Sequence, residues 1–221
     1  MSSTRSKFNA KTLATIAMLC AIAFVAKLIS KVFPDVQGFL SFDLKDVIIV
    51  IGAFILGMLP GALIAVIVSF IEMLTLSATG PIGFVMNVLA SCSFACVAAA
   101  VYHRNRRMKN AVLGLVLGVL CMTGVMLLWN FLITPLYMSV PREVVAGMLL
   151  SVFLPFNLIK GGINATLAML LYKPVVRTLR KANLVQESPA GKGKAKWGII
   201  VISAVLFVTF LLLGLVLAGV F

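Results

Sequence analysis

The chain has 221 residues, of which 62% are hydrophobic and only 11% are charged, and its mean hydropathy is +1.15. Soluble domains carry about 45–50% apolar and about 25% charged residues, so this composition excludes a water-soluble globular domain. Apolar stretches long enough to cross a bilayer recur along the chain, without the alternating pattern of a membrane barrel. The sequence therefore predicts an all-α protein, a polytopic membrane helical bundle.

The net charge of +13 does not indicate nucleic acid as a partner, because the basic residues lie between the apolar stretches without interleaved aromatic residues. The amino terminus and the stretches 103–110 and 173–196 hold 14 of the 19 basic residues. The positive-inside rule places all three on the cytoplasmic side. We therefore expect a multi-pass protein of the cell membrane with its amino terminus in the cytoplasm and its carboxyl terminus outside, in contact with anionic lipids.

The predicted helices, in chain order, cover 13–33, 47–59, 61–76, 82–102, 111–133, 146–172 and 197–220. The first is too long for a signal peptide, and Lys27 and Lys31 near its end are typical of side chains that snorkel to the interface. Pro60 and Gly61 separate the second helix, which is short for a full crossing, from the third. The basic stretch before the last helix is predicted to be a flexible linker.

Polar side chains inside hydrocarbon are costly, so each is a candidate functional residue. Asn157, Lys160 and Asn164 are spaced by three and four residues, which places them on one face of the sixth helix. Asn130 lies near the outer end of the fifth helix, and Asn87 lies in the fourth. The outer positions of Asn130, Asn157 and Lys160 predict a cavity that opens outward and binds an uncharged or weakly anionic, hydrogen-bonding molecule.

A structural role is the alternative for these residues. The asparagines would then join helices, and Lys160 would form an ion pair with Glu72 or Asp46. Cys92 and Cys96 lie one helical turn apart, but no second pair accompanies them, so we expect core cysteines and no metal.

The sequence lacks the motifs of a serine hydrolase, a zinc protease and an ATP-binding loop. We therefore expect no enzymatic activity and no cofactor, and uphill transport would need energy from another subunit. An intramembrane enzyme is the alternative from a different class. A stand-alone secondary transporter is a third, and it would need a coupling-ion site that the sequence does not show.

Four motifs in 10–175 stand in a characteristic order: FLSFDLKD, TGPIGFVMNVLAS, NFLITPLYM and LPFNLIKGGINA. In this order and spacing the chain resembles the riboflavin-specific substrate-binding (S) components of bacterial energy-coupling factor (ECF) transporters. The resemblance implies a six-helix bundle that captures riboflavin from outside. It also implies partners, namely a transmembrane coupling subunit with two cytoplasmic ATPases. The same architecture binding FMN or another vitamin is the alternative.

The resemblance also implies roles for particular residues. The polar contacts to the ligand are Asn130, Asn157 and Lys160, the outer gate is the loop around Leu40 and Phe42, and Gly83 and Met86 line the ring system. Asn87 and Asn164 are included among the substrate-binding candidates. The stripe of small residues that docks on the coupling subunit is Ala10, Ala14, Ala17 and Ala21, for which ordinary alanine-rich packing is the alternative.

One feature departs from the family, which usually ends after the sixth helix. We divide the chain into a substrate-binding domain (1–175), a basic cytoplasmic linker (176–196) and an extra transmembrane helix (197–221). The extra helix is almost free of polar residues and is expected to face lipid. It would be a peripheral anchor or a constraint on docking, and the sequence does not distinguish the two.

Overall fold

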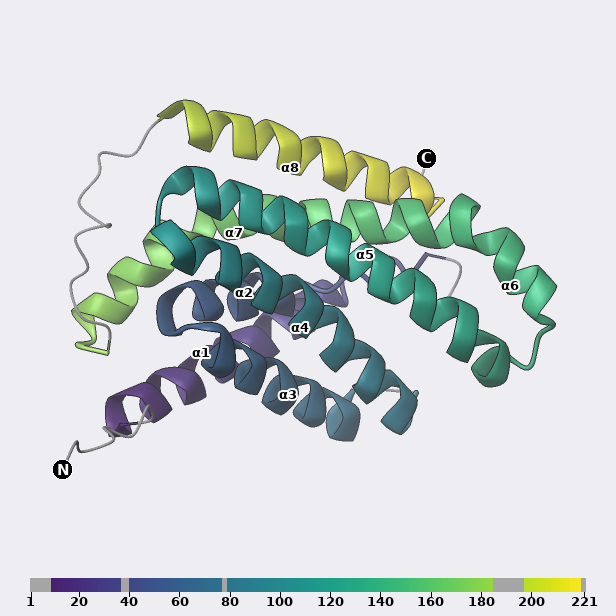
Figure 1. The fold of residues 1–221 in the computed structure, drawn as a ribbon, viewed down its shortest axis with the longest axis horizontal. Coiled ribbons are helices and arrows are strands. Elements are labelled where there is room, and N and C mark those ends of the chain that lie inside the picture. Colours follow the sequence, from purple (N-terminus) through teal and green to yellow (C-terminus); the bar gives the residue numbers. More distant parts are fainter. Residues whose placement is uncertain (1–8, 37–39, 77–78, 185–196, 220–221) are drawn as a thin grey trace.

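The computed structural model describes residues 9–36, 40–76, 79–184 and 197–219, and the regular elements of these residues are helices (Figure 1). In chain order they are α1 (Ala10–Ser30), α2 (Lys45–Leu56), α3 (Met58–Thr75), α4 (Gly80–Asn105), α5 (Met108–Met138), α6 (Arg142–Met148), η1 (Leu149–Phe153), α7 (Leu154–Lys181) and α8 (Trp197–Leu217). The predicted all-α membrane bundle is confirmed.

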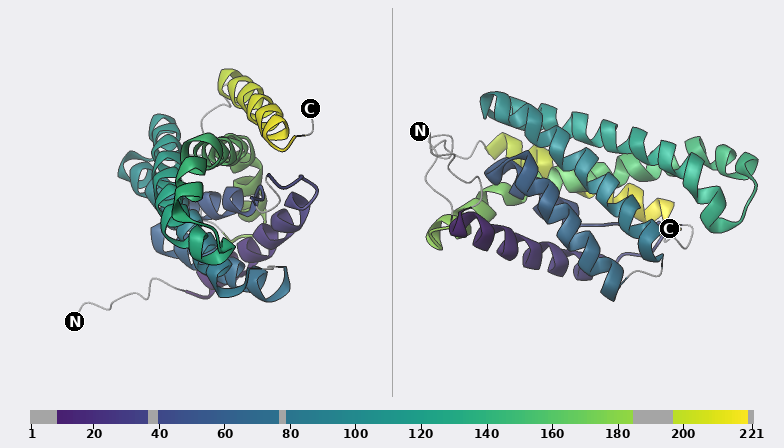
Figure 2. Two further views of the ribbon diagram at one scale, coloured as in Figure 1. Left: turned by 90° about the vertical axis from the view of Figure 1, so that its right-hand side faces the viewer. Right: turned by 60° about the horizontal axis from the view of Figure 1, so that its bottom comes forward.

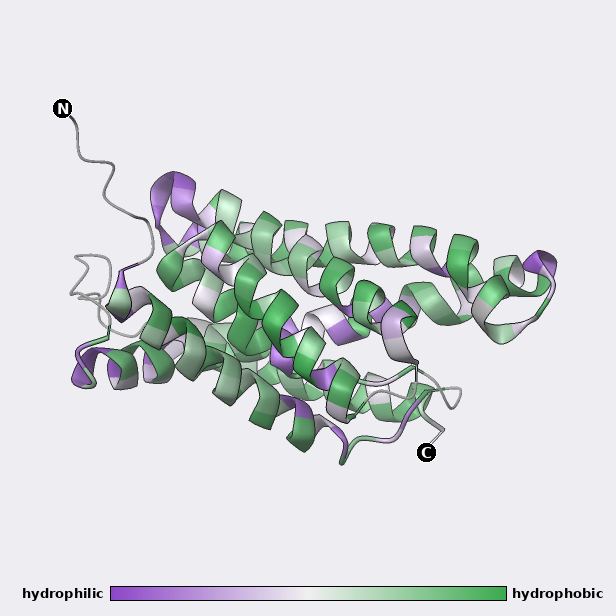
Figure 3. Ribbon diagram, turned by 90° about the horizontal axis from the view of Figure 1, so that it is seen from below, coloured by the Kyte–Doolittle hydropathy of each residue, from purple (hydrophilic) through white to green (hydrophobic). Residues whose placement is uncertain are grey.

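Six helical stretches of the described residues are long and apolar enough to cross a bilayer. One of them, Arg142–Lys181, combines α6, the π-helical turn η1 and α7. Helix α2 is too short to cross the bilayer. Its 12 residues span about 18 Å at about 1.5 Å per residue, whereas the hydrocarbon layer is about 30 Å thick. Figure 3 shows hydrophilic residues mainly at the ends of the helices, with a small hydrophilic group inside the bundle.

The short helix α2 occupies the centre of the bundle (Figure 2). Every residue from Lys45 to Phe54 is buried, and α2 packs against α1, α3, α4 and α7. A helix that is apolar on all sides must be surrounded by other helices or by lipid, and the run VIIVIGAFIL is surrounded by helices. The first turn of α2 therefore carries its charged residues directly into the protein interior.

The break between α2 and α3 lies at Gly57, and the predicted break at Pro60 and Gly61 is wrong. Gly57 has φ 109° and ψ 174°, a conformation that essentially only glycine adopts. Pro60 lies in the first turn of α3, where its missing N–H breaks no hydrogen bond. Gly61 instead permits close packing, because a Cβ placed on it would lie 2.5 Å from the Cβ of Ala53.

Helix α7 continues past the predicted end at 172, so the predicted linker begins later than expected. Val176 and Leu179 are buried, and burial of these side chains extends the helix through the basic stretch to Lys181. Pro174 lies within the helix. Residues 185–196 of the predicted linker lie outside the described residues.

Helix α8 lies alongside α7 at the periphery of the bundle, on the side away from α1 and α3 (Figures 1 and 2). One side of it contacts α7, while Val201, Ile202 and Val205 on the other are more than half exposed. The prediction of a lipid-facing helix is therefore correct for one side only.

Candidate functional site

The candidate site begins in the connector between α1 and α2 (residues 31–44). Val36 and Leu40 form a short antiparallel bridge with N···O distances of 2.8 and 3.0 Å, and the N–H of Leu44 donates to Oγ of Ser30 over 2.8 Å. Phe42 is 5% exposed. These contacts hold the backbone on both sides of Phe42, although residues 37–39 lie outside the described part of the chain.

The polar face predicted for the sixth helix lies on α7. Asn157 and Asn164 are buried, and Lys160 is partly buried. Nδ2 of Asn157 donates to the carbonyl of Phe153 over 2.8 Å, which leaves Oδ1 as its other polar atom. Asn164 is only 1% exposed, and its Nδ2 has no hydrogen-bond partner among the residues that the structure describes. A buried donor of this kind costs about 1–3 kcal/mol while it lacks a partner, so a bound ligand that accepts from it would be stabilised.

Lys160 has no ion-pair partner within 4.0 Å among the described residues. The carboxylate of Glu72 contacts Lys27 and Lys45, and Oδ1 of Asp46 accepts a hydrogen bond from Ser91. The proposed structural ion pair of Lys160 with Glu72 or Asp46 is therefore not formed. Asp43 and Asp46 still lie near enough to attract its ammonium group.

The remaining predicted contacts lie on α5 and α4. Asn130 is buried, its Nδ2 donates to the carbonyl of Met126 over 2.8 Å, and its Oδ1 accepts from Thr134 over 2.9 Å. The predicted residues of α4 lie within its first two turns: Gly83 is buried, while Met86 and Asn87 are half-buried. Asn130 thus makes two of its four possible hydrogen bonds within its own helix and keeps one donor and one lone pair for a ligand.

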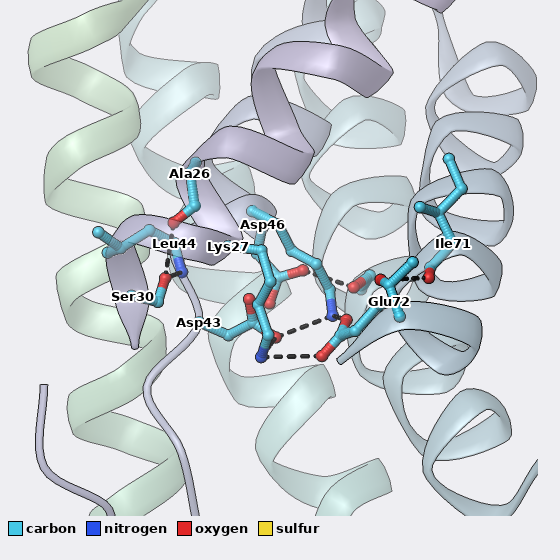
Figure 4. Close-up of polar contacts among 11 residues, drawn as sticks. Ala26, Lys27, Ser30, Asp43, Leu44, Asp46, Ile71 and Glu72 are labelled. Carbon is cyan, nitrogen blue, oxygen red and sulfur yellow. Dashed lines mark hydrogen bonds and ion pairs between the residues drawn. The ribbon is translucent and has the colours of Figure 1, made fainter. Parts of the chain in front are cut away.

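Sequence reasoning missed a buried ion-pair cluster of Lys27, Asp43, Lys45 and Glu72, which we call the ion quartet (Figure 4). Nζ of Lys27 lies 3.2 Å from Oδ2 of Asp43 and 2.8 Å from Oε1 of Glu72. Nζ of Lys45 lies 2.8 Å from the same Asp43 oxygen and also contacts Glu72. Two positive and two negative charges therefore balance inside the bundle, as burial of charge requires.

The predicted snorkelling of Lys27 is wrong, since the residue is only 7% exposed and turns inward to the quartet. Burial alone would raise the pKa of the Asp43 carboxyl, but Lys45 and Lys27 outweigh it and hold that pKa below its usual range. Asp43 therefore remains ionised and fastens the connector to α1 and α2. The sequence does contain a feature that could have indicated this buried cluster, since Asp43 and Lys45 stand just before a long apolar run.

The four alanines of the predicted docking stripe are all exposed on α1: Ala10, Ala14, Ala17 and Ala21. The neighbours that face the bundle, Thr15 and Leu19, are fully buried. The stripe therefore does not pack against the other described residues, and small exposed side chains of this kind allow another helix to approach closely.

Residues 11–172 match the model of the family described as ECF transporter, substrate-specific component. The chain belongs to this family. A solved structure of the S component of a bacterial ECF transporter is 34% identical and superimposes with a TM-score of 0.64, covering 77% of this chain and 98% of that one. This S component is accordingly the substrate-binding subunit of its transporter, as the resemblance implied.

Two curated relatives carry the name riboflavin transporter. RibU of Staphylococcus aureus (strain TCH60) is 33% identical over 177 residues, which cover 77% of this chain and 93% of the relative. FmnP of Bacillus subtilis (strain 168) is 29% identical over 191 residues, which cover 79% of this chain and 98% of the relative. Helix α8 lies beyond residue 172, where the match to the family model ends.

Proposed function

We propose that this S component binds riboflavin and delivers it inward, and that the energy comes from separate subunits. The names of the two relatives support riboflavin as the substrate. The observation that carries the proposal is a pair of groups on α7, namely the ammonium of Lys160, which has no ion-pair partner among the described residues, and the buried Nδ2 of Asn164. Both groups are suited to donate hydrogen bonds to a ligand.

The chemistry of riboflavin fits the residues proposed to bind it. The uracil-like edge of its ring system alternates hydrogen-bond donors and acceptors, and an asparagine amide offers both in one plane. The opposite, dimethylated end favours apolar walls. We assign the polar contacts to Asn87, Asn130, Asn157, Lys160 and Asn164. The apolar contacts are Leu40, Phe42, Gly83 and Met86.

The partners we propose are a transmembrane coupling subunit and two cytoplasmic ATPases. The exposed alanine stripe of α1 supports a helical partner, because small residues allow helix backbones to approach closely. The chain itself would act as a binding subunit without enzymatic activity, and riboflavin would be its ligand without any further cofactor.

The proposed topology places the amino terminus in the cytoplasm and the carboxyl terminus outside. The distribution of basic residues supports it. In this orientation the connector, Lys160 and the ion quartet lie toward the outer side, where the vitamin would enter. The division into a binding domain that ends with α7 at Lys181, a basic linker after it and an extra helix from Trp197 belongs to the same proposal.

The test is a titration of the purified chain in detergent with riboflavin, followed by quenching of flavin fluorescence. Saturable quenching of riboflavin fluorescence that an excess of thiamine does not reverse would support the proposal. A parallel titration with FMN distinguishes a free vitamin from its phosphate as the preferred ligand. A folded protein that quenches neither flavin would refute the assignment of a flavin substrate.

A further inference from the structure

Helix α8 lies outside the stretch that matches the family, yet it contacts two of the elements that carry proposed ligand contacts, the connector and α7. Phe207, Phe210 and Leu217 of α8 pack on a hydrophobic cluster that contains Leu40 and Phe42 of the connector. The same cluster includes Phe156 and Ile159 of α7, which flank Asn157 and Lys160 in the sequence. An anchor that served only to hold the chain in lipid would not need these contacts.

The first contact joins α8 to α7 at Gly162. A Cβ placed on Gly162 would lie 2.7 Å from Cζ of Phe210, closer than carbon atoms approach without displacement. The missing side chain therefore lets the Phe210 ring lie against the backbone of α7, two residues from Lys160. The two neighbouring glycines contact different helices: Gly161 packs against Val119 of α5, and Gly162 packs against Phe210 of α8.

The second contact joins α8 to the connector at Gly214. A Cβ placed there would lie 2.9 Å from Cζ of Phe42 and 3.5 Å from Cγ2 of Ile159. On its other side the Phe42 ring lies 5.3 Å, centroid to centroid, from the ring of Phe156. Phe42 is thus held between α7 and α8, and a side chain at position 214 would displace it.

The packing around Phe42 leaves little free space. The cavity between the connector, α7 and α8, which Phe42, Ile163 and Gly214 help to line, measures about 10 Å³. By this measure a cavity needs about 10–15 Å³ to hold one water molecule, so the space is far too small for an aromatic ring. Phe42 therefore cannot swing toward α8 unless α8 itself moves.

We propose that Phe210 and Gly214 of α8 are positioning residues for the ligand site, because they hold Phe42 against α7. Ligand escape that displaces Phe42 must also loosen α8, so α8 slows dissociation. The identity of the ligand is taken from the proposed function, whereas the packing that restrains Phe42 is independent of it.

The test compares full-length variants in detergent. Gly214→Leu is matched by Gly198→Leu on the same helix, where an added Cβ meets nothing within 4 Å. Phe210→Ala is matched by Leu212→Ala, whose side chain is half exposed. Stopped-flow recovery of flavin fluorescence should show a dissociation rate raised about tenfold in Gly214→Leu and Phe210→Ala, with a much smaller change in the association rate. Both control variants should match the wild type.

A second measurement needs no ligand. Amide hydrogen exchange in the unliganded protein should be faster at Leu40 and Leu44, whose N–H groups are bonded to Val36 and to Ser30, in both α8 variants. If the wild type binds no riboflavin, the proposed function fails and the exchange data still decide the restraint. Dissociation rates and amide exchange that equal those of the wild type in both variants would overturn the inference.

Discussion

Nζ of Lys27 lies 2.8 Å from Oε1 of Glu72, which joins α1 to α3 by an ion pair inside the bundle. Asp43 and Lys45 complete the quartet, so the connector and α2 are fastened to the same two helices. A buried charge that loses its partner is far more costly than an exposed one, because water cannot replace the partner. The quartet therefore determines how the connector sits on the bundle.

Replacement of Glu72 by glutamine should destabilise the protein strongly, because Lys27 and Lys45 would then share the single carboxylate of Asp43. Loss of one partner from a buried pair costs about 3–5 kcal/mol. We expect a clearly lower Tm in detergent for Glu72→Gln. Glu143→Gln, which changes an exposed residue of α6, is the control and should leave Tm unchanged. An equal Tm for the two variants would show that the quartet contributes no stability.

Replacement of Lys160 by methionine should weaken riboflavin binding and lower Tm much less than Glu72→Gln does, because its ammonium forms no ion pair within 4.0 Å among the described residues. A hydrogen bond from a charged donor contributes about 1.5–3 kcal/mol, which corresponds to about a ten- to hundredfold change in Kd. Fluorescence titration measures the effect, with the exposed Lys31→Met as control. A large loss of Tm with unchanged Kd would assign Lys160 a structural role instead.

Replacement of Asn164 by leucine should act in opposite directions on stability and binding. The change removes a buried donor that has no partner in the described part of the chain, so Tm of the unliganded protein should stay the same or rise. Riboflavin should bind more weakly, since the donor is lost. Thermal unfolding with and without the vitamin separates the two effects. A fall in Tm of the unliganded protein would mean that the amide serves packing.

Replacement of Ala17 by tryptophan should prevent association with the coupling subunit and leave riboflavin binding intact, because Ala17 is exposed on α1 and is not among the proposed ligand contacts. Co-purification with the coupling subunit and the ATPases measures association. Ile22→Trp places the same ring on another exposed side of α1. Equal co-purification of both variants with the wild-type level would exclude the alanine stripe as the docking surface.

Replacement of Gly57 by alanine should destabilise the α2–α3 break by about 1–3 kcal/mol, because a side chain is strained at this backbone conformation. Gly124→Ala in α5 is the control, since an added Cβ there has open space and the backbone is helical. Tm should fall for the first variant only. A normal Tm for Gly57→Ala would mean that the break tolerates another conformation.

The sequence by itself predicted the fold class and, apart from the boundaries, every long helix. Hydropathy and helix length are local properties, since a spanning helix needs only a sufficient run of apolar residues. Local spacing likewise placed Asn157, Lys160 and Asn164 on one face of α7. The place of the α2–α3 break was predicted wrongly. Pro60 is compatible with the first turn of a helix, and the sequence does not show that Gly57 adopts a non-helical conformation.

Only the tertiary structure decided which charges meet. The ion quartet draws one residue each from α1, the connector, α2 and α3. Which of these charges pair therefore depends on how the four elements pack. The same holds for α8, whose apolar sequence is compatible with lipid on every side. Its contacts with Gly162 and Phe42 arise because two glycines, far apart in the chain, leave room for aromatic rings. Hydropathy measures transfer into hydrocarbon, and it carries no information about which neighbour replaces the lipid.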